Sequence, residues 1–192
     1  MKLDKNDISL QKLRQENVDA FATYLSQLGD DPTIGPVIDR SRLLSKQGFI
    51  DKYTSELAHS IPPEEMKSDW LIIYFKGKAI GHHAVSPVEF GGTGVFHAHI
   101  WYKDYRRLGI CSWTYPMAGI RFIEKFHLKK ILYHTPKSND KAVKLKEKIG
   151  YRPLGDGKAK NSGLLVDGTD VVLFEADLAT LQGILQRLES KK

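Results

Sequence analysis

Apolar residues in the first third of the chain recur mainly at helical spacing. Residues 8–13 form a short run that predicts a first strand. From Glu16 onward, apolar side chains return every three or four positions, which predicts a helix. Glycine and proline then interrupt the chain between residues 29 and 36, and a second helical stretch covers residues 41–58.

The middle third changes to the pattern of strands. Residues 70–75 are an unbroken apolar run, followed by the turn signal Lys76-Gly77-Lys78 and then by residues 79–85. These segments predict a β-hairpin. After an interruption at Pro87, residues 94–101 predict another strand, so we expect three neighbouring antiparallel strands in chain order.

The last third alternates helices with strands, and Gly150 is placed to end one of the helices. A hairpin sheet joined to strand–helix–strand units is typical of a mixed α/β domain. The elements expected here are a helix over residues 109–126, a strand over 130–134, a helix over 140–149, a strand over 171–176 and an amphipathic helix over 178–188.

Composition narrows the class of protein. The 192 residues, 41% of them hydrophobic, predict one domain over residues 1–192 with a sizeable core. With 27% charged and 10% aromatic residues, disordered and collagen-like chains are excluded. The single cysteine excludes an intramolecular disulfide and a cysteine-based zinc site. Because the longest apolar run, residues 70–75, is too short to span a bilayer and residues 1–10 show no apolar signal segment, we expect a cytoplasmic protein without membrane contact.

The charge balance is compatible with an anionic ligand. There are 29 Lys and Arg residues against 23 Asp and Glu residues, a net charge of +6. A nucleic acid, an anionic cofactor, an acidic substrate or simply a solvated basic surface accounts for such an excess. No stripe of basic residues interleaved with aromatic ones is present, so we expect no nucleic-acid partner.

The segment Tyr105-Arg106-Arg107-Leu108-Gly109-Ile110-Cys111-Ser112 lies between a predicted strand and a predicted helix. Such a turn aims backbone N–H groups and the positive end of a helix dipole at one point. Gly109 leaves room for a bulky anion, and Arg106 and Arg107 add positive charge. The arrangement suits a pyrophosphate, and the alternative is an ordinary strand-to-helix turn with a basic edge.

This loop and a second motif at residues 139–151 together make the chain resemble the GNAT superfamily of acyl-CoA-dependent N-acyltransferases. Arg106 to Cys111 is similar to the family's Gln/Arg-x-x-Gly-x-Gly/Ala loop, except that Cys111 replaces Gly or Ala. Residues 139–151 resemble the family's later helix and the Gly-aromatic start of its next strand. The two motifs cover residues 70–154, and the resemblance implies a mixed, mostly antiparallel sheet with flanking helices and a cofactor wedge between a splayed fourth and fifth strand.

The resemblance implies that coenzyme A binds in this wedge, with no metal. The loop from Arg106 to Ser112 would hold the pyrophosphate, main-chain groups around His99 and Trp101 would face the pantetheine arm, and Asn139 would hydrogen-bond that arm. Asn139 also stands where a helix N-cap is expected. Lys146 replaces the tyrosine that often serves the family as general acid. The expected cofactor-binding residues are His99, Trp101, Arg106, Arg107, Leu108, Gly109, Ile110, Cys111, Ser112, Asn139 and Lys146.

Four histidines fall in the predicted sheet. Strand alternation places His97, His99 and Trp101 on one face. The resemblance implies that a base projects from this strand, and a neutral imidazole suits that task, with His97 favoured over His99. A structural histidine pair, a His-x-His metal pair and the carboxylate Glu89 are the alternatives. Of the adjacent His82-His83, only one can share the cleft.

The sequence therefore predicts an N-acetyltransferase that moves an acetyl group from acetyl-CoA to a primary amine by direct attack in a ternary complex. A small-molecule amine or amino sugar is the favoured acceptor, and a homodimer stays open. The alternatives are a non-catalytic CoA-binding or regulatory module with the same fold, and an acetyltransferase of protein N-termini or lysines.

Overall fold

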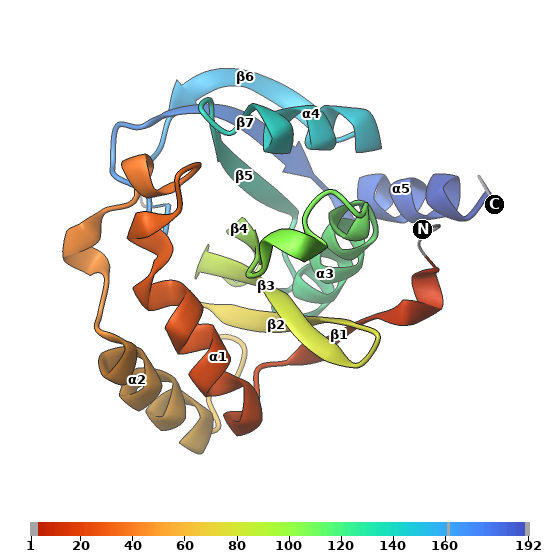
Figure 1. Cartoon of the computed structure of the whole chain (residues 1–192). Helices are drawn as coiled ribbons and strands as arrows, with labels where there is room; N and C mark the ends of the chain where they lie inside the picture. The colour runs from red at the N-terminus through yellow and green to blue at the C-terminus, as the bar shows by residue number, and fades with distance from the viewer. Residues whose placement is uncertain (1–3, 161, 191–192) are drawn as a thin grey trace.

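The computed structural model describes residues 4–160 and 162–190 as a seven-stranded sheet with helices on both faces. The strands lie in the order β1-β2-β3-β4-β5-β7-β6 (Figure 1). The strands are β1 (Ile8–Lys12), β2 (Asp69–Phe75), β3 (Lys78–Val88), β4 (Thr93–Ile100), β5 (Lys130–Pro136), β6 (Arg152–Lys158) and β7 (Asp170–Ala176). The α-helices are α1 (Gln15–Ser26), α2 (Lys46–Ala58), α3 (Ile110–Phe126), α4 (Asp140–Ile149) and α5 (Leu178–Ser190).

The β4–β5 pair is parallel, whereas the other strand pairs are antiparallel. Its register runs only from Thr93↔Lys130 to Val95↔Leu132. Beyond these residues β4 continues to Ile100 and β5 to Pro136 without further pairing between them. The predicted splay of the fourth and fifth strands is therefore confirmed, and it begins after Val95 and Leu132.

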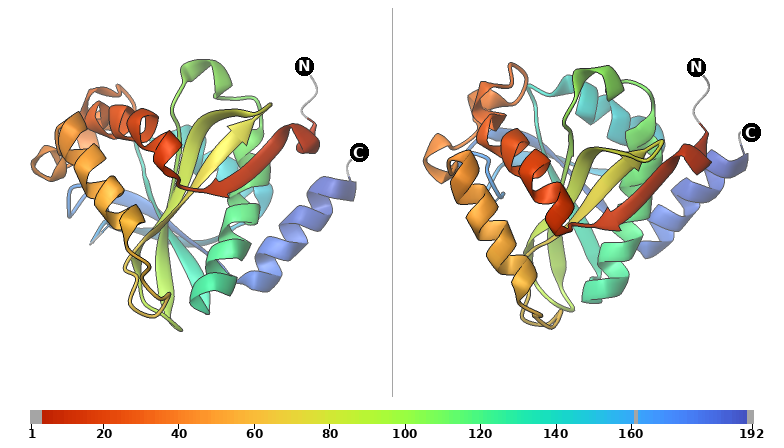
Figure 2. Two further views of the ribbon diagram at one scale, coloured as in Figure 1. Left: turned by 90° about the horizontal axis from the view of Figure 1, so that it is seen from below. Right: turned by 60° about the horizontal axis from the view of Figure 1, so that its bottom comes forward.

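Each face of the sheet has its own core. Figure 2 shows α1 and α2 on one side of the sheet and α3 and α5 on the other. Phe21 of α1 and Phe49 of α2 are buried against Ile72 and Trp101, while Phe122 and Phe126 of α3 pack with α5 on the opposite face. None of the described helices is long and apolar enough to cross a membrane.

Most predicted elements are confirmed, and the differences have local causes. The second helix begins at Lys46 rather than at residue 41, because the Ser45 hydroxyl accepts the Gly48 N–H at 3.1 Å and caps it there. Pro87 does not end β3, which runs to Val88 across a register shift. Strand β6 carries too few apolar residues to show an alternating pattern and is exposed over most of its length.

Candidate active site

The turn before α3 presents an uncapped helix N-terminus. Gly109 has a φ of 82°, in the left-handed region where glycine is favoured, and Arg107 has a φ of 67°. The Ser112 N–H donates to the Gly109 carbonyl at 3.0 Å, and no side chain within the described residues caps the helix. The first N–H groups of α3 are therefore left without a side-chain cap, as the N-terminus of a helix that receives an anion would be.

Arg106 contributes less free charge to this turn than expected. Its Nη2 lies 3.0 Å from Asp31 Oδ2, and its Nε–H donates to the Ile100 carbonyl at 3.3 Å. The Arg106 side chain is 33% exposed and that of Asp31 is 12% exposed, so the pair is partly shielded from water. Arg107 is exposed and takes part in none of the ion pairs found among the described residues, so it is the arginine whose charge stays available.

The pairing of β4 with β3 shows which main-chain groups around His99 and Trp101 face the splay. The Trp101 N–H donates to the Ile80 carbonyl of β3 at 2.8 Å, so it points away from the splay. Backbone groups alternate between the two edges of a strand. The groups that face the splay are consequently those of Ile100 and Ala98, and the Ile100 carbonyl already accepts from Arg106 on that side.

His99 and Trp101 belong to an aromatic cluster beneath α1, on one face of the sheet as predicted. The His99 ring stacks on the His82 ring with centroids 4.9 Å apart. His99 Nδ1 is hydrogen-bonded to the Tyr24 hydroxyl at 2.9 Å, and the Trp101 indole N–H donates to His82 Nδ1 at 2.9 Å. Burial lowers the pKa of His99 to about 3 and lowers that of His82 as well, so both rings are neutral near pH 7.

His97 lies on the same face but has different partners. Its Nε2–H donates to the Ser86 carbonyl at 2.7 Å, which leaves the lone pair on Nδ1. The ring packs against Gly163 in the segment between β6 and β7. Burial lowers the pKa of His97, and the nearby His134, which is hydrogen-bonded to Ser162, lowers it further. His97 is thus a neutral, oriented imidazole.

Two other candidates lie elsewhere. Glu89 is exposed on the turn between β3 and β4, at the end of β4 where Thr93 pairs with β5, whereas His99 is near the opposite end of that strand. His83 points to the α3 face, where its ring lies 5.0 Å from Phe96 and 5.4 Å from Tyr115. The structure therefore brings neither Glu89 nor His83 together with His97 and His99.

Helix α4 supplies the remaining predicted residues. The Asn139 Oδ1 accepts the Ala142 N–H at 3.3 Å, so Asn139 is the N-cap of α4. Lys146 is 6% exposed, with its Nζ over the rings of Tyr115 and Tyr133. Cys111 lies close enough to affect the pKa of Lys146. Asn139, which follows the end of β5, therefore acts as the N-cap of α4. Lys146 is a buried lysine that packs on Tyr133 of β5.

Sequence reasoning missed the roles of Tyr24 and Asp31, which connect the α1 region to β4 and to the turn before α3. Both residues lie far from their partners in the sequence, so no local pattern signals the contacts.

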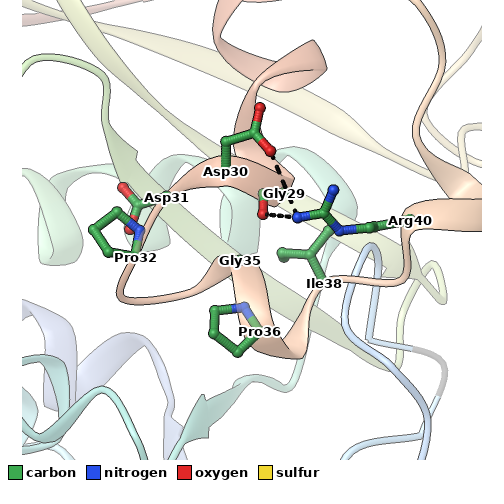
Figure 3. Close-up of a pocket in the computed structure, with 8 residues that line it drawn as sticks. All are labelled: Gly29, Asp30, Asp31, Pro32, Gly35, Pro36, Ile38 and Arg40. Carbon is green, nitrogen blue, oxygen red and sulfur yellow. Dashed lines mark hydrogen bonds and ion pairs between the residues drawn. The ribbon is translucent and has the colours of Figure 1, made fainter.

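Next to Asp31 is an open depression of about 590 Å³ (Figure 3). In it the Arg40 guanidinium donates to the Gly29 carbonyl at 2.6 Å and lies 3.5 Å from Asp30. The depression is lined by Gly29, Asp30, Asp31, Pro32, Gly35, Pro36, Ile38 and Arg40.

Comparisons with known proteins identify the fold. No protein-family model and no curated protein sequence matches the chain. Among solved structures, RimJ of Mycobacterium smegmatis in complex with CoA-disulfide superposes with a TM-score of 0.72 at 14% identity, covering 96% of this chain and 88% of that one. The spermidine N-acetyltransferase of Vibrio cholerae in complex with CoA and spermine superposes with a TM-score of 0.71 at 14% identity, covering 92% of this chain and 99% of that one.

The microcin C7 self-immunity acetyltransferase MccE, in complex with acetyl-CoA and AMP, gives a TM-score of 0.68 at 11% identity, covering 90% of this chain and 93% of that one. Among the described residues, no group of three or more His, Cys, Asp or Glu side chains is arranged to hold a metal ion. The order of strands, the splay and these superpositions agree, and the chain has the fold of the GNAT acetyltransferases.

Proposed function

We propose that this protein is an N-acetyltransferase that uses acetyl-CoA to acetylate a primary amine. The observation that carries the proposal is the parting of β4 and β5 next to the uncapped N-terminus of α3. The pantetheine arm of CoA, with its amide groups, would enter between the strands where they no longer pair, and its pyrophosphate would meet the free N–H groups at Gly109 to Cys111. Neighbours of the same fold bound to CoA or acetyl-CoA support this cofactor.

The residues of the turn before α3 fit the pyrophosphate. Gly109 has no side chain to block it, the first N–H groups of α3 donate to it, and Arg107 adds an exposed charge. When bound, acetyl-CoA supplies an activated acyl thioester. The N–H groups of Ile100 and Ala98, on the unpaired edge of β4, are the donors that polarise the thioester carbonyl.

His97 is the proposed base. An ammonium group with an ordinary pKa near 10 must lose a proton before it attacks the carbonyl. The Ser86 carbonyl fixes the His97 proton on Nε2, so Nδ1 is the accepting atom. His99 is the weaker candidate, because burial lowers its pKa to about 3 and its Nδ1 is bonded to Tyr24. We place the acceptor amine on the α1 face, where both histidines lie, and favour a small-molecule amine or amino sugar.

The second candidate function is a CoA-binding module without turnover. Lys146 and Cys111 favour it, because both depart from the family pattern that the sequence otherwise resembles. A protein N-terminus or lysine is the alternative acceptor, and it is supported by the structural similarity to RimL, a ribosomal L7/L12 α-N-protein acetyltransferase.

The test is incubation with acetyl-CoA and a panel containing a polyamine, an amino sugar, an amino acid amide and a peptide with a free N-terminus. Products are identified by mass spectrometry and CoA release is followed by thiol titration. We expect one class of amine to gain an acetyl group, and Gly109→Glu to abolish the product. CoA binding without any acetylated product would instead establish the non-catalytic module, and failure to bind CoA would overturn both functions.

A further inference from the structure

Helix α4 carries a buried primary amine that the proposed function does not use. Lys146 is 6% exposed, and its Nζ lies 5.2 Å from the centroid of the Tyr115 ring and 5.6 Å from that of the Tyr133 ring. The other lysines of this helix are exposed, namely Lys141, Lys144 and Lys148. None of the ion pairs found among the described residues includes Lys146. A lysine is rarely buried without a counter-ion, so its amine is a candidate for chemistry.

The surroundings of Lys146 favour the neutral, nucleophilic form of its amine. Burial lowers the pKa of Lys146 to about 8, and the two ring faces replace only part of the lost hydration. Nearby groups bring no negative charge near pH 7, because burial raises the pKa of the Cys111 thiol to about 11 and raises that of Tyr115 as well. At pH 7 about one Lys146 side chain in ten is therefore neutral, against about one in a few thousand for an ordinary lysine.

Lys146 lies beside the stretch of β4 that no longer pairs with β5. Tyr133, whose ring it covers, directly follows Leu132, the last residue of β5 in the parallel register. Burial lowers the pKa of His83 to about 3, and the Lys146 charge is close enough to contribute. His83 pairs with Ala98 in the register of β3 with β4. In the proposed binding mode the Ala98 N–H polarises the thioester carbonyl, so the amine of Lys146 and the acetyl carbon are neighbours there.

We propose that Lys146 is a self-acetylation site, whose amine takes the acetyl group from acetyl-CoA bound in the splay of the same molecule. This inference rests on the proposed function. The neutral Nζ forms a bond to the acetyl carbon and loses a proton to solvent. The C–S bond breaks with its electron pair on sulfur, and the thiolate takes up a proton from solvent. Acetyl-CoA and Lys146 thus give CoA and Nε-acetyl-lysine, and no further reactant is needed.

Proximity makes this reaction faster than acetylation of any exposed lysine from solution. A well-oriented neighbouring group reaches effective concentrations of about 10⁵ M or more, far above that of free acetyl-CoA. Packing on two rings also restricts the Lys146 side chain, whereas an exposed lysine samples many rotamers. The product is favoured as well, because the amide removes a buried charge that has no counter-ion.

The test is incubation of the wild type with acetyl-CoA that carries a deuterated acetyl group, without any acceptor amine. Proteolysis and mass spectrometry then assign the label to individual lysines. At pH 7 we expect label at Lys146 to appear at least about tenfold faster than at the exposed Lys148. The rate at Lys146 saturates with acetyl-CoA and does not depend on protein concentration, because the reaction occurs within one complex. Excess CoA, which competes for the splay, slows labelling of Lys146 and leaves that of Lys148 unchanged.

Two variants and a binding measurement separate the outcomes. Lys146→Arg keeps the positive charge and loses the fast label, whereas Lys148→Arg, the matched control, retains it. Because the label is located in the wild type, the result does not depend on whether Lys146→Arg folds. Equal labelling of Lys146 and Lys148, labelling of Lys146 that excess CoA does not slow, or a rate proportional to protein concentration would overturn self-acetylation and leave the proposed function intact. No calorimetric binding of CoA to the wild type would overturn the proposed function itself.

Discussion

The Arg106 guanidinium lies 3.0 Å from the Asp31 carboxylate, and this pair joins the turn before α3 to the segment after α1. A second link runs between the same regions, because the Tyr24 hydroxyl of α1 is bonded to His99 of β4 at 2.9 Å. The turn before α3 and the face that carries the candidate bases are therefore held in one geometry. Arg106 acts here mainly as a connector between elements, which is a different role from the one its sequence motif suggests.

This connection predicts a selective loss of stability. Asp31 also accepts the Thr33 N–H at 2.8 Å, so Asp31→Ala removes a turn bond together with the ion pair. We expect unfolding to become easier by about 1.5–3 kcal/mol, the usual cost of losing hydrogen bonds to a charged group. Asp30→Ala, at the exposed neighbour, is expected to change stability by less than about 0.5 kcal/mol. Urea denaturation of both variants is the measurement, and equal losses would show that the pair contributes nothing specific.

Asn139 has two candidate roles that one substitution separates. Asp caps a helix as well as Asn does, but it lacks the amide N–H that would donate to the pantetheine arm. We expect Asn139→Asp to keep the melting temperature and to weaken CoA binding, whereas Asn139→Ala loses both, at a cost of about 1 kcal/mol of stability for the missing cap. A lowered melting temperature in Asn139→Ala with unchanged CoA affinity in both variants would assign Asn139 to the cap alone.

The burial of a neutral His83 predicts how the stability of the folded protein depends on pH. It is fully buried, neither ring nitrogen has a hydrogen-bond partner among the described residues, and burial lowers its pKa to about 3. The unfolded chain takes up a proton at this site below about pH 6.5, whereas the folded protein does not until near pH 3. Stability is therefore complete above pH 6.5 and is lost as the pH falls.

His83→Leu should remove this part of the acid sensitivity. Between pH 7 and pH 5 we expect the variant to lose about 2 kcal/mol less stability than the wild type, from 1.36 kcal/mol per pKa unit. Guanidinium denaturation at the two pH values measures the difference. If both proteins lose stability equally, the proton uptake that unfolds the wild type occurs at other histidines.

The proposed role of His97 as base predicts how turnover depends on pH. His97 must be neutral to accept a proton, and its lowered pKa places the acidic limb of the profile below pH 6.5. We expect His97→Ala to lower turnover by at least about tenfold, to remove this limb and to leave CoA affinity nearly unchanged. His99→Ala is the comparison variant. Near-normal turnover with an intact acidic limb in His97→Ala would assign the histidine to structure.

Local patterns predict most of the fold. The unbroken apolar run at residues 70–75 and the turn signal at Lys76-Gly77-Lys78 predict the β2–β3 hairpin, and the left-handed Gly150 ends α4 as expected. The turn at Arg106 to Ser112 is located from its motif because backbone geometry, set by Gly109, is local. Strand β6 shows no alternation of its own, since Pro153, Gly155 and Gly157 obscure it, and only the Gly-aromatic end of the family motif indicates a strand there.

The contacts within the candidate site depend on tertiary structure and could not be read in advance. Which edge of β4 faces the splay follows from the pairing of Trp101 with Ile80, and strand alternation alone does not fix it. The Asp31–Arg106 pair joins residues 75 positions apart. The burial of Lys146 likewise follows from the position of α4 over β5, because its neighbours Lys144 and Lys148 look the same in sequence and are exposed.

The most direct measurement of the central claim is calorimetric titration of CoA into the wild type, Gly109→Glu and Arg107→Ala. In the proposed site the backbone N–H groups of the turn before α3 share the pyrophosphate. We therefore expect Arg107→Ala to bind CoA several-fold more weakly and Gly109→Glu to lose binding, because it adds bulk and a like charge there. Gly109→Asn, which tolerates the left-handed conformation without adding charge, controls for strain at the φ of 82°. An unchanged CoA dissociation constant in Gly109→Glu would contradict the assignment of this turn as the cofactor site.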